Sequence, residues 1–305
     1  MVIDQKFIGK TYPDLVYQIA KEKLKEFVLA TKADQEKFAE ITPPTFPVVY
    51  MHDLLWTVLF DPELKLNLAK LVHGEQDFVY HKPTRVGDTI TTKSRIEKIF
   101  SKSVHDFVVM VSESYNQNDE LVCTSTWTFI IRGGNDKDFS LQEKLVVKLM
   151  SLLPPCPNAK AKRMAAMQEL RTLTGADIAL DRALQDLAHH SGDEYKVFID
   201  KYMPQVYAGA SGDFNVIHLD ESFGRQVGLG GYILHGMATM ALGVNYFMKE
   251  KAADSIKRYR ARFSDVVKPM DTLTYSGSQD GDKFSFVAKN QAGKEVLGAG
   301  LVEFA

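Results

Sequence analysis

The sequence has little cysteine and no large excess of charge of either sign. Its 305 residues include two cysteines, Cys123 and Cys156, which lie far apart and outside any CxxC pattern. We therefore expect neither a disulfide framework nor a thiolate zinc site, and a reducing, cytoplasmic compartment fits best. The formal net charge is −2, so no basic surface for nucleic acid is expected. The first residues, "MVIDQKFIGK", contain no apolar leader, which predicts no secretory signal.

Long hydrophobic runs are also scarce, with one exception. Residues 227–248, "VGLGGYILHGMATMALGVNYFM", carry no formal charge and approach the length of a membrane-spanning helix. Three glycines cluster before Tyr232, and His235 and Asn245 are polar groups inside the run. A helix that begins near Tyr232 would be too short to span a bilayer. We therefore expect no membrane insertion and a buried central helix of a globular fold.

Two segments repeat in the same order in both halves of the chain. "KPTRVGDTI" at Lys82 resembles "KPMDTL" at Lys268, and "NQNDELV" at Asn116 resembles "NQAGKEV" at Asn290. In each half a largely apolar helix precedes about four β-rich segments with turn-length connections. This order predicts an α+β protein of two units, each an antiparallel sheet around one central helix. Edge strands of the two units could pair into one continuous sheet, which would protect those edges.

The predicted division of the chain is an N-terminal unit at residues 1–135, a helical linker or insertion at 136–194, and a C-terminal unit at 195–305. The insertion shows apolar residues at helical spacing through "GADIALDRALQDLAHH". His189 and His190 fall on this predicted helix. They have no carboxylate or third histidine at ligand spacing, so no metal site is expected there.

The segment "YAGASGDFNVIHLDE" contains the candidate site. Asp213 and His218 lie in a glycine-rich loop between a short predicted helix and the uncharged helix. Such a pair is often structural, with Ser211 or Asp213 capping the next turn and the histidine a satisfied polar group. Two features favour catalysis: Asn215 adds a third polar side chain, and Gly236 begins the central helix, where free N–H groups could stabilise an oxyanion. Residue chemistry alone leaves both interpretations open.

Taken together, these motifs resemble a known family. "YAGASGDFNVIHLDE" followed by "GLGGYILHGMATM" resembles the MaoC-like, or hydratase-2, family of the hot-dog superfamily. In the first half, "FIGKTYP", "LKEFVLAT", "PPTF" and "STWTFIIRG" resemble the FAS1-like dehydratase domain found beside MaoC domains. The resemblance implies a double hot-dog fold. It also implies a hydro-lyase of fatty acid metabolism that reversibly dehydrates (3R)-3-hydroxyacyl thioesters to trans-2-enoyl thioesters without a cofactor or metal.

The resemblance also implies roles for individual residues. Asp213 and His218 match the catalytic dyad, Asn215 matches the supporting residue of the loop, and the backbone N–H of Gly236 matches the oxyanion donor. Our hypothesis is that His218 takes the α-proton while Asp213 acts on the leaving hydroxyl or the attacking water. Ser211 is a predicted substrate-binding residue.

Two positions around the dyad need separate interpretation. His235 is predicted to be a structural residue at the helix start and not a base. Val216 stands where the family usually has proline. Proline would restrain the loop by roughly 0.4 to 1 kcal/mol, so we expect a less preorganised loop with the reacting groups intact.

The first unit lacks the corresponding loop chemistry. Its segment "KADQEKFAEITPPTF" has no Asp-x-Asn-x-x-His pattern. His52 and Asp53 are adjacent near a predicted helix start, and we interpret them as a helix-initiating polar pair. The sequence therefore predicts that the N-terminal unit contributes no chemistry and shapes the acyl tunnel.

The partner predicted by the resemblance is acyl-CoA or acyl carrier protein, with the chain acting as a monomeric pseudo-dimer or a homodimer. Both carriers need cations near the tunnel mouth. "IKRYRARF" supplies Arg258 and Arg260 on one face of a predicted strand, as a binding patch or as an ordinary solvated face. Two other functions stay open, a hot-dog acyl thioesterase and a non-catalytic acyl-thioester-binding subunit.

Overall fold

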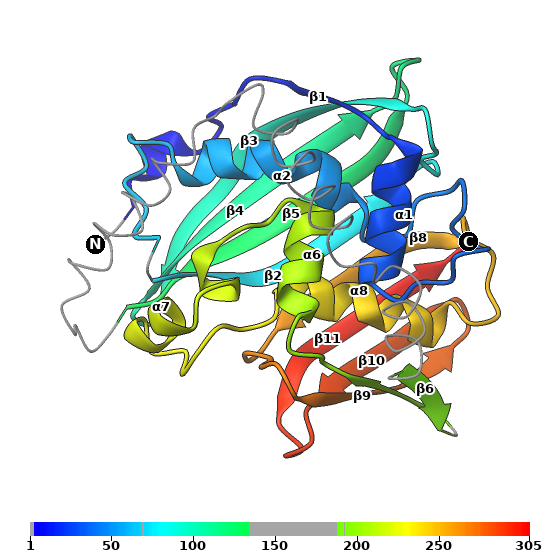
Figure 1. Ribbon diagram of the computed structural model, residues 1–305. Coiled ribbons are helices and arrows are strands. Elements are labelled where there is room, and N and C mark those ends of the chain that lie inside the picture. The colour runs from blue at the N-terminus through cyan, green and yellow to red at the C-terminus, as the bar shows by residue number, and fades with distance from the viewer. Residues whose placement is uncertain (1–2, 69, 134–187, 192) are drawn as a thin grey trace, which may run out of the picture.

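The computed structural model describes residues 3–68, 70–133, 188–191 and 193–305 (Figure 1). The strands are β1 (Leu15–Gln18), β2 (Leu71–Tyr80), β3 (Thr89–Lys102), β4 (His105–Tyr115), β5 (Leu121–Ile131), β6 (Ala188–Ser191), β7 (Glu194–Phe198), β8 (Ile256–Phe263), β9 (Thr272–Asp280), β10 (Lys283–Lys289) and β11 (Glu295–Phe304). The helices are α1 (Lys21–Ala30), α2 (Pro47–Leu59), α6 (Met203–Ser211), α7 (Glu221–Gln226) and α8 (Gly236–Phe247), with 3-10 turns η1 (Gln5–Phe7) and η2 (Val216–His218).

The strands form one continuous antiparallel sheet in the order β1-β3-β4-β5-β2-β8-β11-β10-β9-β7-β6. The two halves of the sheet meet where β2 pairs with β8, a junction that we call the seam. Phe78 lies opposite Tyr259 in this register, and both side chains are fully buried. Outward from the seam the two halves repeat the same strand order. The double hot-dog expected from the sequence is therefore confirmed, including the shared sheet.

The central helices pack against one face of this sheet (Figure 1). The hydroxyl of Tyr259 donates to the backbone oxygen of Met240 at 2.6 Å, and that of Tyr275 donates to Thr239 at 2.7 Å. Buried tyrosines of the sheet thus satisfy their hydroxyls on the backbone of α8. Most side chains of α8 are apolar and buried. No helix in the described parts of the chain is long and apolar enough to cross a membrane.

The repeated motif that begins at Asn116 and again at Asn290 forms the same turn in both halves. In the β4–β5 turn the side-chain oxygen of Asn116 accepts from the backbone N–H groups two and four residues later, at 3.0 and 3.1 Å. Asn290 does the same in the β10–β11 turn, at 3.1 Å for both. Each turn then needs a left-handed residue, which is Asp119 in the first and Gly293 in the second. These shared networks explain why the two short sequences match.

One predicted helix is instead a strand. Residues 188–191, which include His189 and His190, form β6 and pair with β7 in an antiparallel hairpin. The helical spacing upstream does not govern these residues, because backbone pairing with β7 at the sheet edge overrides it. β7 in turn pairs with β9, so the hairpin is part of the C-terminal half of the sheet. Residues 136–187 and 192 of the predicted insertion, with Cys156, lie outside the described residues.

Candidate active site

A sharp turn after α6 starts the loop that carries the candidate dyad. Gly212 ends the helix in the left-handed region, at φ 88°, which a glycine adopts without strain. The hydroxyl of Ser211 donates to the backbone oxygen of Tyr207 at 2.8 Å and accepts from the N–H of Asp213 at 3.2 Å. Ser211 therefore fixes the turn from inside, and its predicted role in binding substrate stays a prediction.

The loop is held by its own side chains despite the missing proline. The carboxylate of Asp213 accepts from the N–H of Asn215 at 3.1 Å, and the side-chain oxygen of Asn215 accepts from the N–H of Ile217 at 3.3 Å. Asn215 thereby caps the short turn η2, which begins at Val216 and ends at His218. The catalytic support predicted for Asn215 stays a prediction. Asn215 thus orients the backbone on which both dyad residues depend.

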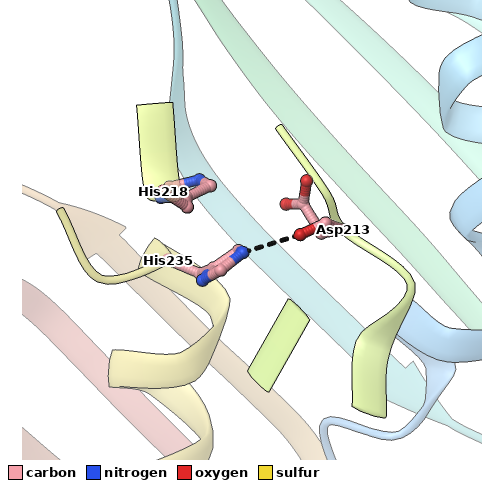
Figure 2. Close-up of side chains that lie close together, drawn as sticks. All are labelled: Asp213, His218 and His235. Carbon is pink, nitrogen blue, oxygen red and sulfur yellow. Dashed lines mark hydrogen bonds between the residues drawn. The ribbon is translucent and has the colours of Figure 1, made fainter. Parts of the chain in front are cut away.

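The side chains of Asp213, His218 and His235 converge in front of α8 (Figure 2). One nitrogen or oxygen atom of each lies within 4.8 Å of those of the other two. His218 comes from η2, His235 from the residue before α8, and Asp213 from the turn after α6. Three segments that are separate along the chain thus meet at one point.

His218 is oriented as a base. Its Nδ1 lies 2.9 Å from the backbone oxygen of Ile233, which can only accept, so Nδ1 carries the proton and Nε2 has a free lone pair. Burial lowers the pKa of His218 below its ordinary value, although Asp213 opposes this effect. The ring is therefore neutral at neutral pH, with Nε2 able to accept a proton.

His235 holds the dyad together. Its Nε2 donates to the backbone oxygen of Asp213 at 2.9 Å, as drawn in Figure 2, and its ring stacks on His218 with centroids 3.7 Å apart. Burial, followed by the neighbouring His218, lowers the pKa of His235 to about 3, so the ring stays neutral. His235 is the N-cap residue of α8, in line with the predicted place at the helix start. The sequence did not indicate its contact with Asp213.

Gly236 begins α8 at a position where an added β-carbon would press against a neighbouring ring. A β-carbon there would lie 3.0 Å from the ring of Phe263. Within the described residues, the N–H groups of Gly236 and Met237 donate to no backbone oxygen, whereas those of Ala238 and Thr239 both bond to the oxygen of His235. Free N–H groups and the positive end of the helix dipole therefore meet beside His235. The oxyanion role of the Gly236 N–H stays a prediction, and these free N–H groups are the feature that it requires.

His52 was misinterpreted from the sequence. The helix α2 begins five residues earlier, at Pro47, so His52 and Asp53 lie in its middle and do not initiate it. His52 is 5% exposed, and its Nε2 lies 4.0 Å from Oδ1 of Asp213. The interpretation as a helix-initiating pair was therefore wrong, whereas the absence of chemistry from the N-terminal unit stays a prediction. The missed signal was the spacing of His52 and Trp56, which places both on one face of the helix.

The pKa of the Asp213 carboxyl depends on the imidazoles of His52, His218 and His235. Burial by itself would raise the pKa of Asp213, but the surrounding imidazoles, above all that of His52, outweigh burial and hold it well below its ordinary value. Burial favours neutral His52, yet the carboxylates of Asp213 and Asp53 prevail and raise its pKa. Asp213 is therefore ionised at neutral pH, next to a neutral base.

The spacing of Asp213, His218 and His235 would also suit a metal ion, but their hydrogen bonds do not. The proton on Nε2 of His235 points to a carbonyl, and the proton on Nδ1 of His218 points to another. The remaining lone pairs are those of Nε2 of His218, Nδ1 of His235 and the Asp213 carboxylate, and Figure 2 shows Nδ1 of His235 on the side of its ring away from Asp213. The donor set fits acid–base chemistry better.

Arg258 and Arg260 lie on β8 at the seam. Arg258 makes a bidentate ion pair with Asp77 of β2, at 2.9 and 2.6 Å. It also lines a cavity of about 530 Å³ between the units, bounded by Tyr50, Ile256 and Lys257 among others and by none of the dyad residues. Arg258 thus ties the two units together, and the predicted contact of both arginines with a carrier stays a prediction.

Sequence comparisons agree with this division into two units. A FAS1-like dehydratase domain region matches residues 6–125, and a MaoC-like domain matches residues 187–298. A UPF0336 protein of Saccharopolyspora erythraea is 33% identical over 146 residues, which are 44% of this chain and 94% of that protein. The mouse peroxisomal multifunctional enzyme type 2 is 25% identical over 247 residues, 79% of this chain but only 29% of the enzyme.

Solved structures show the same fold over the whole chain. A MaoC-like dehydratase from Phytophthora capsici superposes with a TM-score of 0.70 at 18% identity, covering 100% of this chain and 98% of that one. The peroxisomal multifunctional enzyme type 2 of Drosophila melanogaster gives a TM-score of 0.66 at 20% identity, over 96% of this chain and 48% of the enzyme. The chain therefore combines a FAS1-like dehydratase domain region in its first half with a MaoC-like domain in its second half, and it is related to the UPF0336 proteins.

Proposed function

We propose that the protein is a hydro-lyase that interconverts (3R)-3-hydroxyacyl thioesters and trans-2-enoyl thioesters. One observation supports this most directly: a neutral imidazole with a free Nε2 and an ionised carboxylate converge beside the free N–H groups of a helix N-terminus. Removal of water from a 3-hydroxyacyl thioester needs these three elements, a base, a group on the β-hydroxyl and a stabiliser of the enolate oxygen. The FAS1-like dehydratase region of the first half, and the likeness in fold to a MaoC-like dehydratase, agree with this reaction class.

The thioester carbonyl is placed at the start of α8. The N–H groups of Gly236 and Met237 donate to its oxygen, and the helix dipole stabilises the negative charge that develops there. The close approach of Phe263 to Gly236 keeps this position free of a side chain. The α-proton of a thioester bound in this way becomes acidic enough for an imidazole to remove.

The dyad then moves one proton. Nε2 of His218 takes the proton from the α-carbon, while Asp213 accepts a hydrogen bond from the β-hydroxyl. The C–O bond breaks, the α,β double bond forms, and the proton that His218 took from the α-carbon passes to the leaving oxygen, so that water departs. The proton gained equals the proton given, and the dyad returns to its starting state. Hydration follows the same steps in reverse.

The direct test is hydration of trans-2-enoyl-CoA by the purified protein, followed as loss of the conjugated thioester absorbance. Chain length should be varied from short to long, and the same acyl groups should be offered on acyl carrier protein, because either carrier fits the proposal. Absence of turnover with every chain length on both carriers would refute the reaction class. The profile itself identifies the preferred chain and carrier.

The two other functions give different signals in the same assay. A thioesterase would release free thiol, which a thiol reagent detects without any change in the enoyl absorbance. A non-catalytic subunit would bind acyl-CoA without turnover, and Asp213→Asn would leave that binding unchanged. Loss of hydration in Asp213→Asn with binding retained would separate the proposed function from both alternatives.

A further inference from the structure

The site already described includes two residues of the first unit that the reaction does not use directly. His52 and Trp56 lie one helical turn apart on α2, the central helix of the N-terminal unit. The indole N–H of Trp56 donates to Nε2 of His52 at 2.8 Å. Neutral His52 therefore carries its proton on Nδ1, and the same Nε2 lies 4.0 Å from Oδ1 of Asp213. One nitrogen atom thus has two prospective partners.

The His52 ring also packs against the backbone of the catalytic loop. A β-carbon added to Gly212 would lie 3.4 Å from Nδ1 of His52. Gly212 is the left-handed residue that starts the turn before Asp213. A change in the size of the His52 side chain would therefore move this turn, and the position of the Asp213 carboxylate would change with it.

Trp56 supports the other end of the loop. Phe223 and Val227 form a small buried cluster, and Trp56 packs against it together with Val216 and Ile217. The cluster joins the first unit to the residues that follow Asn215. Val216 occupies the position of the family's proline, so packing across the two units supplies restraint that the backbone lacks there.

We propose that His52 and Trp56 are positioning residues of the active site: the pair supports the loop that carries the dyad, and Nε2 of His52 alternates between Trp56 and Asp213 as its partner. In the neutral state Nε2 accepts from the indole and leaves the Asp213 carboxylate available to substrate. In the protonated state Nε2 donates towards Asp213, and the Asp213 carboxylate is then held in an ion pair and is not available to substrate. The first unit thereby completes the site of the second.

The sign of the pH dependence follows from the groups around His52. The titratable groups that face it are Asp53 on α2, Asp213 in the loop and His235 at the start of α8. Despite its burial, the pKa of His52 is raised by the two carboxylates, whereas burial lowers that of His218. As pH falls, His52 therefore takes up its proton before His218 does. Protonation of His52 therefore sets the acid limb of the pH profile in the intact protein, the range in which kcat/KM falls as the pH decreases.

Two variants should move that limb in opposite directions. His52→Gln reaches the same position with an amide that does not titrate, so the acid limb of kcat/KM should move to lower pH, where His218 protonates. Trp56→Phe keeps an aromatic ring in the cluster but removes the N–H, which makes protonation of His52 easier and should move the limb to higher pH. Thr57→Ala, on the exposed side of α2, is the matched control and should follow the wild-type profile.

A third variant separates the steric support that the His52 ring gives to the loop from the effect of the charge of His52. His52→Ala removes the ring behind Gly212 and should lower kcat by roughly tenfold to a hundredfold, the cost of a misplaced catalytic group. His52→Gln should restore most of this loss at high pH. A His52→Gln profile identical to wild type, or movement of the limb in the same direction for both variants, would overturn the proposal. So would full activity of His52→Ala.

The kinetic part of this inference rests on the proposed function, so a readout without turnover is needed. The chain has two tryptophans, so a protein labelled with ¹⁵N-tryptophan shows two indole signals, and Trp56→Phe assigns them. The Trp56 signal should shift as His52 titrates and should not shift in His52→Gln. This shift is expected even if no thioester is hydrated, which distinguishes failure of the proposed function from failure of the inference. An indole signal of Trp56 that does not titrate would overturn the alternation of partners.

Discussion

The two loops that precede the central helices differ in chemistry, although the strands around them match. In the first half the loop ends at Phe46 and α2 begins with Pro47, which has no N–H to offer. In the second half it ends at His235, and α8 begins with Gly236, whose N–H is free. The strand order and the turn networks are copied, whereas the polar groups at the helix start are not. Duplication of this fold therefore preserved the frame in both copies and the proposed acid–base site in one.

The largest effect that tests this asymmetry is expected from the dyad. Asp213→Asn and His218→Ala should each lower kcat/KM for hydration by about 10²- to 10⁴-fold, because each removes a proton-transfer group. Glu36→Gln, an exposed change in the corresponding loop of the first half, is the control and should leave the rate unchanged. Initial rates of hydration of a trans-2-enoyl thioester measure kcat/KM for the two dyad variants and for the control. Either dyad variant with more than about a tenth of wild-type activity would remove that residue from the mechanism.

Gly236→Ala tests the helix start itself. The added methyl group meets the ring of Phe263 at 3.0 Å and displaces the N–H donors, so kcat should fall by about 10²- to 10³-fold, as when an oxyanion donor is lost. Pro47→Ala supplies an N–H at the start of α2 and is the matched change in the first half. It should leave kcat as in wild type. A fall in kcat of similar size for both variants would mean that helix stability, not the oxyanion site, is being measured.

Arg258→Glu tests the seam that joins the halves. The change replaces the ion pair with Asp77 by repulsion from both Asp77 and Glu303, and should lower the free energy of unfolding by roughly 1 to 3 kcal/mol in urea titrations. Adding Asp77→Arg should restore part of this loss. A variant of unchanged stability with a raised KM for CoA and carrier-protein substrates would instead support the binding role predicted from the sequence.

The smallest effect is expected from Val216→Pro. Asn215 has an extended backbone, at φ −57° and ψ 129°, which suits the residue before a proline, and Val216 is the first residue of η2, where proline is well tolerated. The free energy of unfolding should rise by roughly 0.4 to 1 kcal/mol, with kcat nearly unchanged. Thermal melting measures the gain. A lower melting temperature would show that the contact of Val216 with Phe223 and Val227 matters more than restraint of φ.

Much of the fold could be predicted from local pattern. The β-rich segments "HDFVVMVSESY" and "EVLGAGLVEF" form strands β4 and β11, and the Asn116 and Asn290 turns are encoded in a few adjacent residues. The dyad loop could also be predicted, because its polar groups and glycines lie within ten residues, 209–218. Such features depend on neighbours in the chain, which the sequence displays directly.

The features that sequence did not predict depend on partners from distant segments. His52 looked like half of a polar pair with Asp53, because its contact with Asp213 joins residues of different units. The bond from His235 to the backbone of Asp213 spans 22 positions. β6 is a strand only because β7 lies beside it. Periodicity within one segment carries no information about any of these contacts.

The seam also has a consequence for synthesis of the chain. Asp77 and Arg258, which pair across it, are separated by 181 positions. At a translation rate of about 5 to 20 residues per second, β2 therefore waits roughly 10 to 35 s for β8. During that interval the first unit presents β2 as an open edge that could pair with another nascent chain. A ribosome-bound or truncated first half should accordingly associate with itself or recruit chaperones, while the full-length chain closes that edge internally.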